Sequence, residues 1–357
     1  MSRRSRLLAA LLAGAVVLAG CAGAGGDRAG RPSGIGAVDC TPLDAPETIT
    51  VGSSSTVAIG TSLQAEGNGL YEKENLRIRN ETFRSGQDII ALIGRGQLDA
   101  GLGGFSANYF SAVAQGVEVY LVGSQGRLNP ADLASGFYVR SSLLDDGTVR
   151  SVADLRDRSV AFPGNNGSGA AYLASLLLAQ GGVTLNDIRQ VSLTYADIPA
   201  AMANGSIDAA WIGSPFAEAI ERDGTGRRIG DQSVFAGEDL AAIFIGPNLT
   251  RDRPRVGCAF LRANIMAARG PLAPGANQRP ESVAAFVAGG LPESLVRSTP
   301  DYVYDPTLDV SRGTIERMQR LYMDVGVLDL DAPLPYERVV PEDFRRQVVA
   351  SLDRQPG

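Results

Sequence analysis

The sequence contains no histidine and a single lysine, and these two absences exclude large classes of function. Of its 357 residues 33 are basic, and all of these except Lys73 are arginine. Without imidazole the chain forms no Ser–His or Cys–His nucleophile pair and lacks the commonest general base and metal ligand. Most hydrolases and zinc enzymes are thereby excluded. A Schiff-base enzyme would depend on Lys73 alone, whose polar neighbours at 71–74 are typical of a solvated helix face.

The sequence also has no basic stretch beyond the N-terminus. The 39 acidic residues outnumber the 33 basic ones and give a net charge of −6. Nucleic-acid-binding proteins carry basic patches that neutralise phosphates, and the sequence offers none. We therefore expect no nucleic-acid partner. The length itself predicts about two domains.

The N-terminus reads as a targeting segment. Three arginines precede an apolar run at 7–19, which is too short to span a bilayer as a lasting helix but suits the core of a signal peptide. Small residues lead directly to Cys21, as in bacterial lipoproteins. We predict a signal peptide at 1–20 and lipidation of Cys21, with a general secretory signal as the alternative. The expected location is extracytoplasmic, with the lipid on Cys21 anchoring the protein to the cell membrane.

Two cysteines remain after lipidation of Cys21. Removal of residues 1–20 leaves 30 basic against 39 acidic residues, a net charge of −9. Residues 21–46 are rich in glycine, alanine and proline and have no apolar period, which predicts a flexible tether after the lipidated cysteine. Cys40 and Cys258 form an even pair in an oxidising compartment, which favours a disulfide over two free thiols.

A repeated unit predicts two similar lobes. The stretch 88–104 aligns without gaps onto 197–213, and each copy reads as an amphipathic helix, a stopping glycine (Gly96 or Gly205) and a short strand. With only two copies, the pattern indicates an α/β fold of two lobes and excludes a solenoid. We expect lobe I at 47–135 plus 241–357 and lobe II at 136–240, each with a sheet flanked by helices.

Four loops that precede helices contain the candidate binding residues. Small, hydroxyl and amide residues at a helix start offer backbone N–H donors and the positive end of the helix dipole, and aromatic neighbours add an apolar wall. Each loop by itself is also explained by helix capping, and Trp211 by core packing. The candidate ligand-binding residues are Ser53, Ser54, Ser55, Thr56, Gly104, Phe105, Ser106, Asn165, Asn166, Gly167, Ser168, Trp211 and Ser214.

Several stretches resemble one known family. The lipoprotein start and the segments 49–52, 96–104, 151–162 and 205–211 are similar to the nitrate/sulfonate/taurine family of ABC-transporter substrate-binding proteins, over roughly residues 47–350. The resemblance implies a type II periplasmic-binding-protein fold that closes on a solute between its lobes. It also implies ABC permease and ATPase partners, no catalysis, no cofactor and no metal. We expect a monomer.

The resemblance leaves the ligand open. We expect a small organic anion of the sulfonate, taurine, nitrate or aromatic acid type. A pyrimidine that is a thiamine precursor is the alternative, because pyrimidine proteins share the superfamily. An enzyme on the same fold or a membrane-tethered sensor are further alternatives, although the histidine and the cysteine-rich motif of the pyrimidine synthases are absent here.

Overall fold

A computed structural model describes residues 35–53, 59–83, 86–129, 131, 133–214 and 216–354, except for the side chains of 86–88. Four of the predicted residues, Cys21, Ser54, Ser55 and Thr56, lie outside these ranges. Within the described ranges, no helix has both the length and the apolar character required to cross a bilayer.

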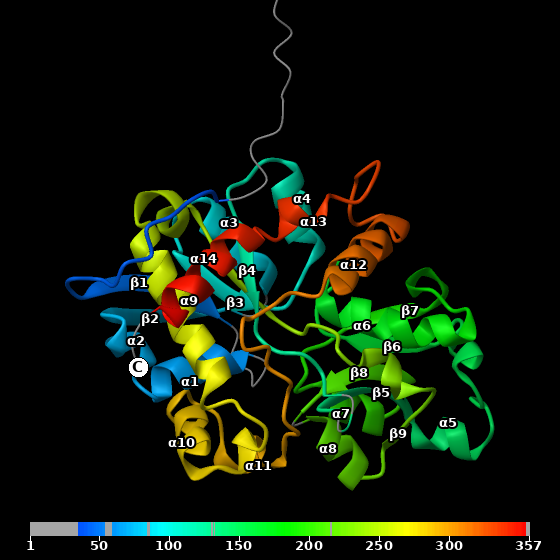
Figure 1. The fold of residues 1–357 in the computed structure, drawn as a ribbon. Helices are drawn as coiled ribbons and strands as arrows, with labels where there is room; N and C mark the ends of the chain where they lie inside the picture. The colour runs from blue at the N-terminus through cyan, green and yellow to red at the C-terminus, as the bar shows by residue number, and fades with distance from the viewer. Residues whose placement is uncertain are drawn as a thin grey trace, which may run out of the picture. The chain divides into compact units, whose positions relative to one another are not determined.

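The first sheet is mixed and is built from two separate parts of the chain (Figure 1). Strand β1 pairs in parallel with β2 and β3, and β10 returns after the second sheet to pair antiparallel with β3 and β4. Among the described residues the order is β2-β1-β3-β10-β4. The bounds are β1 Glu47–Ser53, β2 Leu76–Thr82, β3 Ala100–Gly103, β4 Tyr120–Ser124 and β10 Ala242–Ile245.

The second sheet repeats this pattern with the order β7-β6-β8-β5-β9 in the described chain. Here β6 pairs in parallel with β7 and β8, and β5 runs antiparallel to β8 and β9. The bounds are β5 Ser135–Arg140, β6 Ser159–Phe162, β7 Arg189–Ser192, β8 Ala209–Gly213 and β9 Gly226–Arg228. The two sheets confirm the expected fold class, and we call the first sheet with its helices lobe I and the second lobe II.

Helices flank both sheets (Figure 1). The longest, α9, packs against α1, α2 and α14 in lobe I, and α6 packs against β6 and β8 in lobe II. The α-helices are α1 Gly60–Gly67, α2 Leu70–Lys73, α3 Gly86–Gly94, α4 Ala107–Ala114, α5 Ser141–Asp145, α6 Gly169–Leu178, α7 Ile198–Ala203, α8 Phe216–Arg222, α9 Pro254–Arg269, α10 Pro280–Ala288, α11 Glu293–Ser298, α12 Arg312–Asp324, α13 Tyr336–Val339 and α14 Glu342–Asp353. Shorter turns are the 3-10 helices η2 Val152–Leu155, η3 Ala179–Gly181, η4 Leu185–Asp187, η5 Gln232–Phe235 and η7 Ala276–Gln278, and the π-helix η6 Asn248–Asp252.

The predicted repeat is present as α3–β3 in lobe I and α7–β8 in lobe II. Gly96 and Gly205 follow the two helices with φ angles of 69° and 78°, a left-handed conformation that glycine adopts without steric cost. Each glycine turns the chain back toward its sheet. The strand of each copy then enters the sheet beside a parallel neighbour, β1 for β3 and β6 for β8.

Residues 35–46 belong to the predicted tether, yet they are held against lobe I. Cys40 and Cys258 form a disulfide with an S–S distance of 2.06 Å. The guanidinium of Arg262, fully buried in α9, donates a 2.6 Å hydrogen bond to the carbonyl of Cys40, and the Val38 amide donates to Gln347 of α14 at 2.9 Å. The partners of residues 38 and 40 thus lie more than 200 positions away in the sequence.

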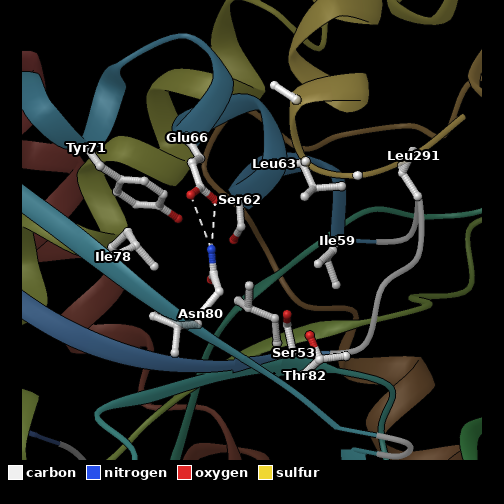
Figure 2. A pocket seen from close by; sticks show the side chains of 15 residues that line it. Ser53, Ile59, Ser62, Leu63, Glu66, Tyr71, Ile78, Asn80, Thr82 and Leu291 are labelled. Carbon is white, nitrogen blue, oxygen red and sulfur yellow. Dashed lines mark hydrogen bonds between the residues drawn. The ribbon is translucent and has the colours of Figure 1, made fainter. Parts of the chain in front are cut away.

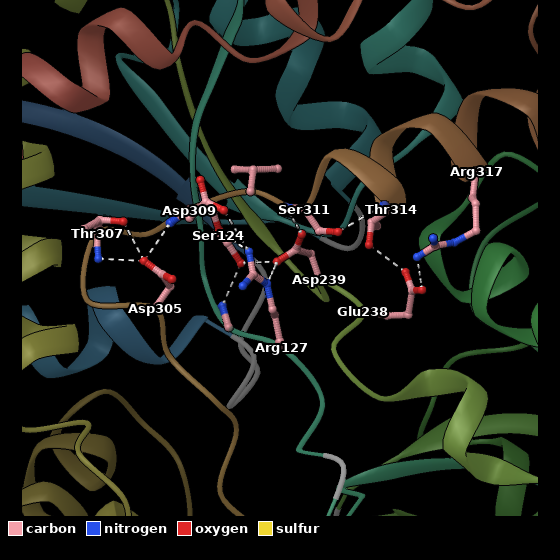
Figure 3. A network of polar contacts seen from close by, with 12 residues as sticks. Ser124, Arg127, Glu238, Asp239, Asp305, Thr307, Asp309, Ser311, Thr314 and Arg317 are labelled. Carbon is pink, nitrogen blue, oxygen red and sulfur yellow. Dashed lines mark hydrogen bonds and ion pairs between the residues drawn. The ribbon is translucent and has the colours of Figure 1, made fainter.

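A polar network joins the connections between the lobes (Figure 3). Arg127, between β4 and β5, exchanges backbone hydrogen bonds of 2.9 Å with Val303 and forms a β-bridge with Asp239, which precedes β10. Its guanidinium pairs with the buried Asp239 carboxylate at 2.9 Å, and the Ser311 amide donates to the other carboxylate oxygen at 2.7 Å. Three segments that are distant in sequence are thus fixed together where the chain passes between the sheets.

Helix α12 extends this network to lobe II. Glu238 accepts hydrogen bonds from the hydroxyls of Tyr172 on α6, at 2.8 Å, and Thr314 on α12, at 2.7 Å, and it pairs with Arg317. Figure 3 shows Thr314 and Arg317 on either side of the Glu238 carboxylate. The C-terminal third therefore contacts both lobes, since α12 also packs against α4 of lobe I.

Candidate functional site

Two of the predicted loops meet at a place that we call the lobe junction, formed by residues 104–107 of lobe I and 165–169 of lobe II. Ser106 and Ser168 form an isolated antiparallel β-bridge, and the Ala107 amide donates a 2.8 Å hydrogen bond to the Gly167 carbonyl. The backbones approach so closely that a Cβ on Gly169 would lie 3.2 Å from the Phe105 carbonyl oxygen. Both loops follow parallel strands, β3 and β6, at the sheet edge where α/β proteins bind ligands.

The two serines of this bridge use their hydroxyls differently. Ser168 caps α6, because its Oγ accepts a 3.1 Å hydrogen bond from the Ala171 amide, and the same hydroxyl donates to the Pro163 carbonyl at 2.9 Å. Ser106 stands at the equivalent position of α4 but makes no cap hydrogen bond. Its side chain is 3% exposed, and within the described chain its Oγ has no hydrogen-bond partner. A buried hydroxyl without a partner is costly and is available to a ligand.

The other residues of these two loops differ in how far they are exposed. Gly104 and Asn165 are exposed, Asn166 is half-buried and Gly167 is buried, with the Gly167 amide bonded to Asn165 Oδ1 at 2.9 Å. Phe105 is 1% exposed and lies in the hydrophobic core.

Trp211 lies in the core of lobe II. The side chain is 1% exposed, and its ring meets Phe235 edge to face with 4.5 Å between the ring centroids. The structure therefore brings together the Ser106 and Ser168 loops but packs both predicted aromatics inside the protein. Neither ring is accessible as a ligand wall in this arrangement of the lobes.

Ser214 belongs to the fourth predicted loop and leads to an acidic residue that sequence reasoning missed. The Ser214 hydroxyl donates to Oε1 of Glu218, one turn later in α8, and the Ser214 amide donates to the Ala134 carbonyl at 2.8 Å. The other carboxylate oxygen, Oε2, is buried and has no partner among the described residues. It can accept a hydrogen bond from an N–H or O–H group.

Tyr302 and Tyr304, which lie beside the connections between the lobes, were also missed, because residues 241–357 were expected to belong to lobe I alone. Burial raises the pKa of Tyr302, opposed by a hydrogen bond with the Ser135 side chain at the start of β5. Tyr304 lies against α1, since a Cβ on Gly60 would overlap its hydroxyl. The rings of Tyr302 and Tyr304 meet edge to face at 6.5 Å. The sequence signal is the aromatic pair itself, set two residues apart before α12.

A pocket of about 290 Å³ lies within lobe I and begins at Ser53, the last residue of β1 (Figure 2). Figure 2 shows Ile59, Leu63 and Leu291 on one side of it and Ile78 on the other. Of the predicted site residues that the structure describes, Ser53 alone lines it. The complete lining is Val51, Ser53, Ile59, Ser62, Leu63, Glu66, Tyr71, Ile78, Asn80, Thr82, Leu102, Ala288, Gly289, Gly290 and Leu291.

The described residues offer no group of three or more acidic or cysteine side chains that could hold a metal ion. The arginines of the polar network are already engaged, because Arg127 pairs with Asp239 and Arg317 with Glu238. The described part of the junction can therefore bind a ligand through the Ser106 hydroxyl, whereas the Glu218 carboxylate offers an acceptor beside the Ser214 loop.

The chain is similar in sequence to a protein family and to several known binding proteins. A family model described as NMT1/THI5 like matches residues 58–250, which is more than half of the chain. A Brucella abortus relative, named only as a binding protein, is 25% identical over 193 residues that cover 53% of this chain and 56% of the relative. The chain thus matches little more than half the length of that relative. An Escherichia coli relative named for binding aliphatic sulfonates is 26% identical over 309 residues, 85% of this chain and 89% of the relative.

The solved structures include one with the same fold. The alkanesulfonate-binding protein SsuA from Xanthomonas axonopodis pv. citri, bound to MOPS, superimposes with a TM-score of 0.63 at 22% sequence identity. The match covers 85% of this chain and 99% of that protein. At this level of identity the likeness establishes the architecture of two mixed sheets.

Proposed function

The chain belongs to the NMT1/THI5-like family, and on that premise we propose that it is the extracytoplasmic solute-binding component of an ABC importer. It captures a small organic molecule at the lobe junction and delivers it to a membrane permease that a cytoplasmic ATPase drives. The proposal assigns no catalytic step to the chain. The relative named for binding aliphatic sulfonates, which matches over 85% of the chain, supports this role.

The observation that carries the proposal is the Ser106 hydroxyl, which has no hydrogen-bond partner among the described residues and lies at the bridge between the lobes. A ligand that bonds this hydroxyl and the neighbouring amides interacts with both lobes at once, because Ser106 lies opposite Ser168 in the β-bridge and the Ala107 amide bonds the Gly167 carbonyl. Such a ligand stabilises the closed arrangement through its higher affinity for that arrangement.

The ligand that we propose is a small organic anion, with sulfonates and amino sulfonates first. Hydroxyls and amides at the helix starts bind an oxyanion. Glu218 Oε2 has no hydrogen-bond partner among the described residues, and a ligand that reaches α8 and carries an N–H or O–H donor, such as taurine, is favoured over nitrate. Aromatic acids and the pyrimidine precursor of thiamine complete the candidate set.

A thermal-shift screen of the purified protein tests the proposal. Nitrate, taurine, aliphatic and aromatic sulfonates, aromatic carboxylates and pyrimidines are each added in turn. A ligand at one hundred times its Kd adds about 2.7 kcal/mol to the free energy of unfolding, which raises the melting temperature measurably. A shift with one chemical class supports the carrier role, and no shift with any class contradicts it.

Two matched serine variants locate the site. We expect Ser106→Ala to weaken binding of the identified ligand about three- to tenfold, since one lost hydrogen bond is worth ~0.5–1.5 kcal/mol. Ser168→Ala is the control, because its hydroxyl is already engaged in capping α6. Unchanged affinity in Ser106→Ala would place the ligand elsewhere.

Lipidation of Cys21 is a separate part of the proposal and lies outside the described residues. We propose that the signal peptide at 1–20 is removed and that the acylated Cys21 anchors the protein to the membrane. Metabolic labelling with a clickable fatty acid tests this proposal. Label in the native chain and none in Cys21→Ser supports the anchor, whereas label in neither chain contradicts it.

A further inference from the structure

We propose that the pocket of lobe I holds the hydrocarbon tail of the ligand whose polar head binds at the lobe junction. The inference rests on the proposed function and narrows it to an amphiphilic organic anion with an aliphatic chain. It starts from one point of continuity: Ser53 ends β1, lines the pocket and belongs to the first of the four loops assigned to the ligand.

The strands and α1 place aliphatic side chains on opposite sides of the pocket. Side chains two apart on a strand share a face, so Val51 stands beside Ser53 on β1, and Ile78 shares a face with Asn80 on β2. Leu63 of α1 faces them from above the sheet. A chain of methylene groups between these walls would contact aliphatic carbon on both sides.

Four of the polar side chains that line the pocket, those of Ser62, Glu66, Tyr71 and Asn80, already have partners within the protein. Asn80 Nδ2 donates to both carboxylate oxygens of Glu66, at 3.2 and 3.0 Å, as Figure 2 shows. Deeper in the pocket, the Tyr71 hydroxyl accepts from Asn264 Nδ2 at 3.1 Å, and the Ser62 hydroxyl donates to Asn264 Oδ1 at 2.7 Å. The aliphatic side chains Ile59, Leu63, Ile78 and Leu291 provide much of the remaining border, and an apolar group fits between them.

The size of the pocket fits a tail better than a whole ligand. At about 290 Å³ it lies just below the range of ~300–1,000 Å³ that complete small-molecule sites occupy. The turn after α10 closes one side, where a Cβ on Gly289 would come within 2.6 Å of Leu63. Phe105 and Trp211, the predicted apolar walls, are in the core, so this pocket offers accessible aliphatic surface beside the Ser53 loop.

A chain-length series measures occupancy of the pocket. Linear alkanesulfonates from methanesulfonate to decanesulfonate are titrated into the full-length protein by calorimetry. Each methylene that enters the pocket should tighten Kd about fourfold, which corresponds to ~0.8 kcal/mol per buried CH₂, until the pocket is full and the affinity levels off. The same Kd for every chain length would overturn the tail assignment and leave the proposed function intact.

Variants that fill the pocket provide the second arm. Ile78→Trp should abolish the gain with chain length while methanesulfonate binds as before, and Arg77→Trp, on the opposite face of β2, should keep the gain. Thr82→Trp, at the exposed end of the strand, is the reserve variant if Ile78→Trp does not fold. An undiminished gain in the folded filling variant would overturn the tail assignment.

A neutral probe separates this inference from the proposed function. If no alkanesulfonate binds, the sulfonate function fails, and 1-octanol is then tested by saturation-transfer NMR against the native chain and Ile78→Trp. Octanol contacts that Ile78→Trp removes and Arg77→Trp retains would still support an alkyl-binding pocket. The absence of such contacts would overturn it.

Discussion

The two copies of the repeat place an aspartate at the same point but secure it differently. Asp99 accepts a 2.8 Å hydrogen bond from the Thr50 amide of β1, and Asp208 accepts a 3.0 Å bond from the Ser159 amide of β6. Each aspartate thus ties its own strand to the parallel neighbour. The cation beside Asp99 is Arg253 at 2.6 Å, at the start of α9, whereas Asp208 pairs with Arg140 of β5 at 3.2 Å.

The difference shows that the aspartate of lobe I depends on the returning chain, whereas the aspartate of lobe II is secured by residues of its own lobe. Lobe I takes β10 and α9 from beyond residue 240, and its buried Arg262–Glu74 ion pair and its disulfide both join α9 to earlier residues. The partners of Asp208 lie within residues 135–228, all of them in lobe II. Damage to the long-range contacts should therefore affect β1 more than β6.

The largest expected effect comes from the buried ion pair. Arg262 donates from Nε and from a terminal nitrogen to Glu74 Oε2, at 2.9 and 2.6 Å. Glu74→Gln leaves the buried guanidinium without its counter-charge, and we expect a loss of ~3–5 kcal/mol in the free energy of unfolding. Urea unfolding measures the loss, and hydrogen exchange should show faster opening of β1 than of β6. The exposed Glu72→Gln on the same helix is the control, and equal losses in the two variants would refute the assignment.

The disulfide should have the next largest effect. It joins residues 218 positions apart and reduces the conformational entropy of the unfolded chain. The double variant Cys40→Ala, Cys258→Ala should therefore lose ~2–4 kcal/mol in the free energy of unfolding. Reductant should lower the melting temperature of the native protein to that of the double variant. The melting temperature of the double variant itself should not change in reductant. A native melting curve that reductant leaves unaltered would contradict the bond.

The two repeat aspartates should have the next largest effect. We expect Asp99→Asn and Asp208→Asn each to lower the free energy of unfolding by ~1–3 kcal/mol. Burial acts to raise the pKa of Asp208, but hydrogen bonds from Ser159 and Arg140 outweigh it and hold the pKa below its ordinary value. A lowered carboxylate pKa stabilises the folded state above pH ~4 and loses this effect as the pH falls through the folded-state value.

The cost of Asp208→Asn, measured by denaturant unfolding, should therefore be full at pH 7 and shrink below pH ~4. Asp99→Asn at pH 7 provides the matched copy in lobe I. A cost for Asp208→Asn that does not change with pH would show that the charge of Asp208 has no role.

Local signals predicted most of the scaffold, and long-range contacts account for the rest. The gap-free alignment of 88–104 onto 197–213 and the glycines at 96 and 205 identified the repeat, because these patterns depend on neighbouring residues. The disulfide between Cys40 and Cys258 was predicted, but the hydrogen bonds that hold residues 38 and 40 to α9 and α14 could not be, because their partners lie far along the chain.

The site was predicted only in part for the same reason. The loops at 106 and 168 were identified from their composition, but the sequence could not tell which of the two serines caps its helix. Phe105 and Trp211 read equally well as ligand walls or as core, and only packing distinguishes the two. Glu218 gave no local pattern, and the pair Tyr302 and Tyr304 gave only its spacing.

The smallest effect separates these two serines. Ser168→Ala removes the cap of α6, which typically costs ~0.5–2 kcal/mol. Ser106→Ala removes a buried hydroxyl that has no described partner, so we expect no loss of stability, or a slight gain. Thermal unfolding without ligand measures both changes. An equal loss in the two variants would mean that Ser106 is a structural residue. A loss confined to Ser168→Ala would mean that the buried Ser106 hydroxyl does not stabilise lobe I. That result is expected for a polar group that is kept to bind a ligand.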